Sequence, residues 1–585
     1  MGSGRHFSNV DLTPFSPFSR RAPHTLRVRK SARRSRRVLG GTLVWLFAAY
    51  ATCANPALDA RSEPAAARPA NPGSAPVPAH AGGAGIERVY TLANPGPVWF
   101  GAEGPRAATG VALQALRDAG ERGLVPEDYD ADALERQVEA LRSGSREPDA
   151  VARADRALTV AVLRFLSDLR SGRVPAQEVE PNYRGQPQSA GFAAQLREAV
   201  ARDRLADLIE AAEPTYPSYA RLKRLLAQYR RLAALPPIAL PPLPSPRSKF
   251  VAGDRYPDVE ALQAQLVRLG DLAADSPLPD DNTYAHGLAE GVRRFQERHG
   301  LQPDAVLGKD TVAALNVPLA TRIAQITLSL ERLRWLPQPS PGPLIGINIP
   351  SFQLWAFADA SAPEPPTLSM PVVVGRAMRT ETPVFLGEMR FVEFSPYWNV
   401  PPSILRNELL PRLEADPTYA GREDMEVVSA RRDGRAYAAV DGASIAALRS
   451  GEARLRQRPG AGNALGGVKF VLPNTMDIYL HATPARELFA RTRRDFSHGC
   501  IRVREPQALA RFVLRDQPEW TPEAIEAAMQ SGVNRIVPVA RPIPVIVFYT
   551  TAIVDRDGRA RFLADIYGHD RRLLEALRRS SRAAH

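Results

Sequence analysis

The sequence predicts a multidomain α+β protein with a helical N-terminal part, a small helical module and a mainly-β C-terminal domain that contains a helical insert. Its 585 residues far exceed the roughly 100–200 residues of a usual domain. Proline-rich stretches at 236–246 and 337–343 divide the chain, because proline removes a backbone donor and ends helices. Apolar residues recur at helical spacing before these divisions and in short strand-like runs after residue 343.

The N-terminal segment, residues 1–54, has the composition of a targeting signal. The formal net charge is +13, and ten basic residues against one acidic residue place +9 of it within residues 1–37. The remaining chain therefore carries no electrostatic footprint for nucleic acid. Residues 38–51 form an uncharged apolar run that is short for a bilayer span and typical of a signal peptide. We expect this segment to engage the export machinery, with an uncleaved inner-membrane anchor or a lipoprotein modified at Cys53 as the alternatives.

The next two segments predict a tether and a helical domain. Residues 55–86 are rich in Ala, Pro and Gly without a hydrophobic period, which predicts a disordered tether. Residues 87–247 turn helical, since apolar residues in 111–116 and 158–169 are spaced by three and four. We expect a helical scaffold domain there.

Residues 248–318 carry a pattern that resembles the peptidoglycan-binding module, a unit of three short helices found in many cell-wall enzymes. The residues that carry the resemblance are Leu262-Gln263, Leu269-Gly270, Phe295-Gln296, His299-Gly300-Leu301, Asp304, Thr311 and Leu315-Asn316. Ala305 stands where the module usually has glycine, so the turn there is expected to differ. A helical module that binds no glycan would show the same apolar spacing and remains an alternative.

Residues 319–550 predict a mainly-β domain. The strand-like runs are 344–349, 353–357, 370–374, 389–394, 468–472, 476–481 and 543–549. Residues 402–462 interrupt them with a helix pattern at 404–413 and a polar, glycine-bearing loop at 454–462. A helical insert inside a β domain is a candidate lid. Residues 551–585 predict a C-terminal strand and helix.

Cysteine occurs only at Cys53 and Cys500, which excludes a disulfide framework and a Cys-rich zinc site. His481 precedes the run Ser497-His498-Gly499-Cys500 by 15 intervening residues. An imidazole near a thiol favours the nucleophilic thiolate and can protonate a leaving amine. The neighbouring glycine lets the backbone turn so that N–H groups face a developing oxyanion. A buried structural cysteine is the alternative.

The pattern His-x15-Ser-His-Gly-Cys-x-Arg resembles the signature of the L,D-transpeptidases of bacterial cell walls. Three further segments resemble the large periplasmic murein type, which has a scaffold domain, a peptidoglycan-binding domain and a capping insert; they are residues 395–404, 462–470 and 565–568. The resemblance implies that Cys500 is the acylated nucleophile and that His481, held by a backbone carbonyl, is the general base. It also implies that His498 orients the loop and that the Gly499 and Cys500 amides form the oxyanion hole.

Several other residues are candidates for binding substrate. Arg502 matches the motif and could hold a substrate carboxylate with two parallel hydrogen bonds. Further candidates are Ser497, Tyr479, Trp398 and Asn463, although we expect Tyr479 and Trp398 to pack rather than react. The resemblance implies neither a metal nor an organic cofactor.

The implied activity is the formation of 3–3 cross-links between peptidoglycan stem peptides in the periplasm. A donor tetrapeptide would acylate the cysteine and release its terminal D-Ala, and an amine of the acceptor stem would resolve the thioester. Carbapenem-type compounds are the inhibitors implied. Alternatives are an L,D-carboxypeptidase, a variant that attaches or releases a lipoprotein, and a non-enzymatic wall-binding scaffold. A papain-like peptidase fits less well, because its cysteine precedes its histidine.

Overall fold

The computed structural model describes residues 89–90, 96–144, 147–185, 191–243, 248–277, 281–362, 365–431 and 434–584. The predicted targeting segment 1–54 and tether 55–86 lie outside the described residues. Within the ranges described, no helix is both long and apolar enough to cross a membrane.

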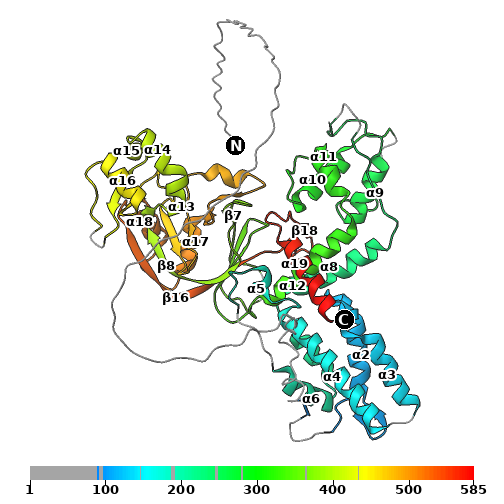
Figure 1. Cartoon of the computed structure of the whole chain (residues 1–585). Helices are drawn as coiled ribbons and strands as arrows, with labels where there is room; N and C mark the ends of the chain where they lie inside the picture. The colour runs from blue at the N-terminus through cyan, green and yellow to red at the C-terminus, as the bar shows by residue number, and fades with distance from the viewer. Residues whose placement is uncertain are drawn as a thin grey trace, which may run out of the picture. The chain divides into compact units, whose positions relative to one another are not determined.

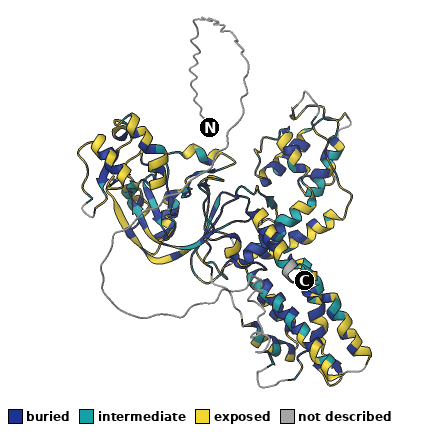
Figure 2. Cartoon of the chain, in the orientation of Figure 1, coloured by how far each residue is buried: buried dark blue, intermediate teal, exposed yellow. Residues whose placement is uncertain are grey.

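The N-terminal part is a helical bundle, as predicted (Figure 1). Its elements are β1 (Phe100–Gly101), β2 (Gly104–Pro105), α2 (Ala107–Arg117), η2 (Asp118–Arg122), η3 (Pro126–Tyr129), α3 (Ala131–Ser143), α4 (Pro148–Ser171), α5 (Ala176–Val179), α6 (Phe192–Ala201) and α7 (Leu205–Ala212). The longest helix, α4, begins at a proline, which suits the first helical position, and is followed by Gly172 with a φ of 83°. Its predicted apolar stripe, including Leu158, Phe165 and Leu169, is buried. Figure 2 shows the buried sides of these helices facing one another.

Two helices pack together with a C-terminal hairpin into a separate core. They are α8 (Pro217–Ala233) and α12 (Leu319–Trp335), and the hairpin is β17 (Ala552–Val554) with β18 (Ala560–Phe562). The final helix is α19 (His569–Ala584). Arg334 of α12 is fully buried and forms an ion pair of 3.0 Å with Glu331, so its charge is compensated inside this part of the molecule.

The small module has the predicted three helices, α9 (Val259–Leu269), α10 (His286–Arg298) and α11 (Lys309–Leu315), with the short pair β3 (Lys249–Phe250) and β4 (Leu307–Gly308). Ala305 adopts a φ of 57°, in the left-handed region that favours glycine. Its N–H donates to Gln296 Oε1 at 2.9 Å, and its carbonyl accepts from Tyr284 at 2.8 Å. The backbone therefore takes up a left-handed turn at Ala305, in spite of the alanine.

The C-terminal part holds a nine-stranded sheet in the order β14-β7-β15-β13-β12-β8-β16-β5-β6, and it closes on itself because β6 also pairs with β7. Its strands are β5 (Leu344–Asn348), β6 (Gln353–Phe357), β7 (Leu368–Gly375), β8 (Phe385–Phe394), β12 (Val468–Val471), β13 (Leu480–His481), β14 (Asp495–Ser497), β15 (Ile501–Val503) and β16 (Arg535–Phe548). The helical elements η5 (Arg486–Ala490), α17 (Pro506–Val513) and α18 (Pro522–Gln530) follow β13 and β15. The fold is thus multidomain α+β, as predicted.

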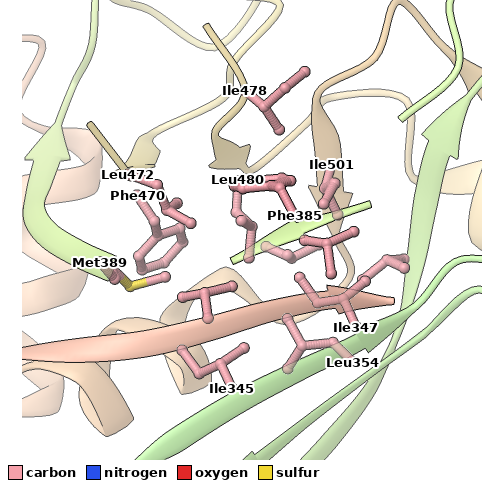
Figure 3. Packing of buried hydrophobic residues seen from close by; sticks show 14 of the residues in the cluster. Ile345, Ile347, Leu354, Phe385, Met389, Phe470, Leu472, Ile478, Leu480 and Ile501 are labelled. Carbon is pink, nitrogen blue, oxygen red and sulfur yellow. The ribbon is translucent and has the colours of Figure 1, made fainter. Parts of the chain in front are cut away.

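The sheet encloses the main hydrophobic core, which Figure 3 shows from close by. The labelled side chains come from six strands and from the segment between β12 and β13; they are Ile345, Ile347, Leu354, Phe385, Met389, Phe470, Leu472, Ile478, Leu480 and Ile501. Full burial of a side chain of this size contributes about 1.5–3 kcal/mol. Because successive side chains of a strand alternate between faces, the neighbours of these core residues point away from the core.

The predicted strand over 476–481 is wrong for most of its length, since only Leu480–His481 form β13. The side chain of Asn474 accounts for the difference. Its Oδ1 accepts the N–H groups of Met476 and Ile478, and its Nδ2 donates to the carbonyl of Ile478 at 2.7 Å. These bonds hold the segment as a compact turn that competes with strand pairing.

The insert contains both helices and a sheet. Its elements are α13 (Pro402–Ile404), the π-helical turn η4 (Leu405–Leu409), α14 (Leu410–Ala415), α15 (Tyr419–Arg422), β10 (Met425–Ser429), α16 (Gly442–Ser450) and β11 (Ala453–Gln457). β11 pairs with β10 and with β9 (Trp398–Asn399). The predicted loop at 454–462 is therefore wrong in its first half, where Leu455 and Gln457 are buried in this small sheet.

Candidate active site

Cys500 lies between β14 and β15 and is half-buried. Because β13 and β15 are parallel, with Leu480 opposite Ile501, the residues before them, Tyr479 and Cys500, lie side by side. The Tyr479 side chain is hydrogen-bonded to the thiol, and Sγ lies 3.5 Å from the carbonyl oxygen of Asp477. Burial raises the pKa of the Cys500 thiol, while the hydrogen bonds from Tyr479 and the charge of Lys469 oppose this rise.

His481 ends β13 and is buried. Its Nδ1 lies 2.5 Å from the carbonyl oxygen of Ala482. A carbonyl can only accept, so Nδ1 carries the hydrogen and Nε2 is the unprotonated nitrogen of the neutral ring. Burial, assisted by the charge of Arg502, lowers the pKa of His481 to about 3. The imidazole is therefore neutral at pH 7.

One row of polar side chains crosses the sheet on the face opposite the core. The strand register places Arg502 opposite His481, His481 opposite Lys469, and Lys469 opposite Glu393. The Lys469 ammonium lies 4.4 Å from the centre of the Tyr479 ring and 3.5 Å from Glu393. A positive charge is thus held beside the tyrosine that contacts the thiol.

The turn before Cys500 is fixed by its own side chains. Gly499 has a φ of 113°, which favours glycine. Ser497 Oγ donates to the carbonyl of Cys500 at 2.5 Å and accepts the N–H of Gly499 at 3.1 Å. The expectation that the Gly499 amide serves the oxyanion hole is therefore wrong for this structure, because that N–H is already engaged. Ser497 is buried, so the structure also contradicts its expected contact with substrate.

The Cys500 N–H remains the donor available at the nucleophile. The structure gives it no hydrogen-bond partner among the described residues. His498, by contrast, points out of the loop, and its Nε2 lies 2.6 Å from Oε1 of Glu408 in η4 of the insert. The structure therefore places His481 on the strand next to β15, opposite Arg502, and His498 at the contact between loop and insert.

Comparison with known proteins gives three matches along the chain. The family models that match are a scaffold domain at residues 84–226, a peptidoglycan binding domain at residues 255–315 and an L,D-transpeptidase catalytic domain at residues 342–536. The last match contains the whole site described above. Residues 342–536 form an L,D-transpeptidase catalytic domain.

One relative supports the same assignment. A Haemophilus influenzae protein described as "Putative L,D-transpeptidase" is 33% identical over 250 residues, which is 43% of this chain and 48% of that protein. The chain thus spans about half the length of this curated relative.

Arg502 lies in β15, two residues after Cys500, and the strand register places it opposite His481. Its Nε is buried and has no hydrogen-bond partner among the described residues. Burial lowers the pKa of Arg502, and the charge of the neighbouring Arg376 lowers it further. Two neighbouring guanidinium groups, one of them with an unused donor, form a place for an anionic group.

Two predicted substrate-binding residues instead build the base of the insert. Asn463 is 1% exposed, and its Nδ2 donates to the carbonyls of Pro396 and Arg458 while its Oδ1 accepts the N–H of Leu465. The prediction that Asn463 contacts substrate is wrong, because backbone groups occupy its amide. Trp398 lies in β9 and packs against the insert core, so it is not placed as a substrate contact.

Sequence reasoning missed three residues of the site, namely Lys469, Glu408 and Thr382. Lysine occurs only five times in a chain dominated by arginine, so Lys469 carried a weak signal. Glu408 and Thr382 carried none, since their contacts depend on segments 90 and 117 residues away. In the part of the chain that the structure describes, no group of three or more His, Cys, Asp or Glu could hold a metal ion.

Proposed function

We propose that the protein forms 3–3 cross-links between peptidoglycan stem peptides through a thioester on Cys500. One observation supports this proposal: Cys500 directly precedes β15, while the neutral imidazole of His481 ends the adjacent parallel strand β13. The N–H of Cys500 has no hydrogen-bond partner among the described residues. These three groups are a nucleophile, a general base and an oxyanion donor.

Acylation begins with the thiol of Cys500. His481 Nε2 takes the thiol proton as Sγ attacks the carbonyl carbon of the third residue of a tetrapeptide stem. The Cys500 N–H donates to the oxyanion that develops. When the tetrahedral intermediate collapses, the C–N bond breaks, His481 returns the proton to the amine of the departing D-Ala, and a thioester remains.

Resolution uses the same groups in reverse. A side-chain amine of a second stem loses a proton to His481 and attacks the thioester carbonyl, and the thiol leaves with the proton. Attack by water would yield a free tripeptide instead, which is the carboxypeptidase alternative. Arg502 and Arg376 attract the carboxylate of the bound stem and hold it near Cys500.

The insert acts as a lid in this proposal. Glu408 of η4 touches His498, next to the nucleophile, so the insert is held against the loop that carries the thiol. A closed insert excludes water from the thioester and favours the amine acceptor.

The other domains fit a protein that works at the cell wall. The module at 255–315 would hold peptidoglycan near the transpeptidase domain. A wall polymer lies outside the cytoplasm, so we expect an extracytoplasmic, periplasmic location. Carbapenems are the expected inhibitors, because their strained amide acylates the same thiol.

The proposal is tested with purified protein and tetrapeptide-bearing wall fragments, using mass spectrometry to separate cross-linked dimers, free tripeptides and released D-Ala. We expect dimers joined between two third residues. Tripeptides without dimers would favour the carboxypeptidase alternative, and no release of D-Ala would indicate a non-enzymatic scaffold.

A further inference from the structure

Residues 376–382, in the loop that joins β7 to β8, lie against the nucleophile turn. The N–H of Arg376 and the hydroxyl of Thr380 both donate to the carbonyl of Ser497, each at 3.0 Å. The hydroxyl of Thr382 donates to the carbonyl of Gly499 at 2.7 Å. Two segments 117 residues apart are therefore joined at three points.

The bond from Thr382 determines how one peptide group is oriented. The Gly499 carbonyl and the Cys500 N–H belong to the same peptide bond, which is planar and trans, so they point in opposite directions. Thr382 is fully buried and holds the carbonyl on its own buried side of the turn. The Cys500 N–H is consequently turned away from Thr382, toward a side where it has no protein partner among the described residues.

Thr382 is itself held in a single arrangement. Its hydroxyl accepts the N–H of Gly375 at 2.8 Å, so both of its hydrogen-bonding roles are used. Tyr567 donates to the carbonyl of Gly375 at 2.5 Å and accepts the N–H of Thr382 at 3.3 Å. A Cβ at position 375 would lie 1.9 Å from the carbonyl oxygen of Thr380, so only glycine allows this close approach.

We propose that Thr382 is a positioning residue for the oxyanion donor: its buried hydroxyl keeps the Gly499–Cys500 peptide turned so that the Cys500 N–H faces the reacting carbonyl. This inference rests on the proposed function. Ser497 holds the N–H of Gly499 and the carbonyl of Cys500, but the peptide between them is not restricted by a Cβ at position 499. A second group must therefore fix the orientation, and Thr382 is the side chain that contacts this peptide's carbonyl.

The test uses two reactions of the same thiol. Alkylation by iodoacetamide displaces iodide at a saturated carbon and develops no oxyanion, whereas acylation by a carbapenem requires the oxyanion donor. Thr382→Val removes the hydroxyl at nearly constant shape, and Thr382→Ser retains it. Thr380→Val is the matched control, because it removes a similar hydroxyl that contacts Ser497 instead of the Gly499–Cys500 peptide.

We expect Thr382→Val to alkylate within about threefold of wild type and to acylate on the order of 10²-fold more slowly, near the loss seen when one oxyanion donor is removed. Thr382→Ser should restore most of the acylation rate, and Thr380→Val should change it by less than about fivefold. Tyr567→Phe removes the partner of the Thr382 N–H but leaves the Thr382 side chain unchanged, so it should show a smaller loss of acylation with normal alkylation. It serves as the second variant if Thr382→Val does not fold.

Equal losses in both reactions would overturn the inference, because they would indicate a general disturbance of the thiol. Unchanged acylation in both Thr382→Val and Tyr567→Phe would overturn it as well. Failure of the proposed function looks different: the wild-type protein would be alkylated by iodoacetamide and never acylated.

Discussion

Glu408 of the insert and His498 of the nucleophile loop lie 2.6 Å apart, from Oε1 to Nε2. They join a π-helical turn to the residue two positions before Cys500. Single π-turns within helices are often found at functional sites. Both side chains are partly exposed, at 42% and 30%, so the pair holds the insert weakly enough to open.

Glu408→Ala should therefore affect the partition of the thioester between amine and water more than the rate at which the thioester forms. We expect the ratio of cross-linked dimer to free tripeptide to fall severalfold, because water reaches the thioester more often, while carbapenem acylation stays within about threefold. Glu414→Ala is the control, since it breaks a pair with Arg449 inside the insert. Product ratios on tetrapeptide stems measure the effect, and an unchanged ratio would show that this contact does not close the insert.

Replacing His481 should slow acylation more than replacing His498. His481→Ala removes the group with the unprotonated Nε2 and should slow acylation by on the order of 10²–10⁴-fold. His498→Ala removes only the contact with Glu408 and should cost less. Acylation rates of both variants, measured under the same conditions, decide the matter, and the reverse order would assign the base to His498.

The pH dependence of alkylation should show a thiol that is harder to ionise than usual. Since burial raises the pKa of Cys500, the thiolate fraction and the alkylation rate should keep rising above pH 8.5, where an ordinary thiol begins to level off. The pKa of His481 is about 3, so no inflection from this residue is expected between pH 5 and 8.

Lys469→Met tests the charge beside the thiol. Because Lys469 lowers the pKa of Cys500, its removal should move the alkylation profile to higher pH by up to about one unit, and Lys469→Arg should leave it nearly in place. A profile that moves equally in both variants would assign the effect to lost packing on Tyr479.

Asn463 should contribute to stability and not to substrate binding. Asn463→Ala leaves buried backbone carbonyls and an N–H without partners, which should lower the free energy of unfolding by about 1–3 kcal/mol. Asn407→Ala, at an exposed position of the insert, is the control. Calorimetry should show a lower thermal midpoint for the first variant only, and a KM effect at wild-type stability would contradict this role.

Much of the fold could be predicted because many helices and strands follow from the spacing of apolar residues within one short segment. The strands β5, β6, β7, β8 and β12 coincide with buried apolar runs, and the helices α2 and α4 with spacings of three and four. The small sheet of the insert was missed because β9 and β11 pair across more than 50 residues, and only that pairing makes a polar segment such as 454–457 a strand.

The site divides in the same way. Cys500 and His481 stand out because their residue types carry chemistry wherever they are placed. Asn463 was predicted to bind substrate, because the sequence does not show whether the side-chain amide of a polar residue is hydrogen-bonded to the protein's own backbone. Thr382 could not be predicted from the sequence, because its role depends on the carbonyl of Gly499, which the fold brings to 2.7 Å from its hydroxyl.

The most direct test of the central claim is the mass of the intact protein after rapid quenching with a tetrapeptide-bearing wall fragment. We expect an adduct equal to the donor without its terminal D-Ala, mapped by peptide digestion to Cys500, and absent from Cys500→Ala at near wild-type thermal stability. Cross-linking that persists in Cys500→Ala, or an adduct on another residue, would contradict it.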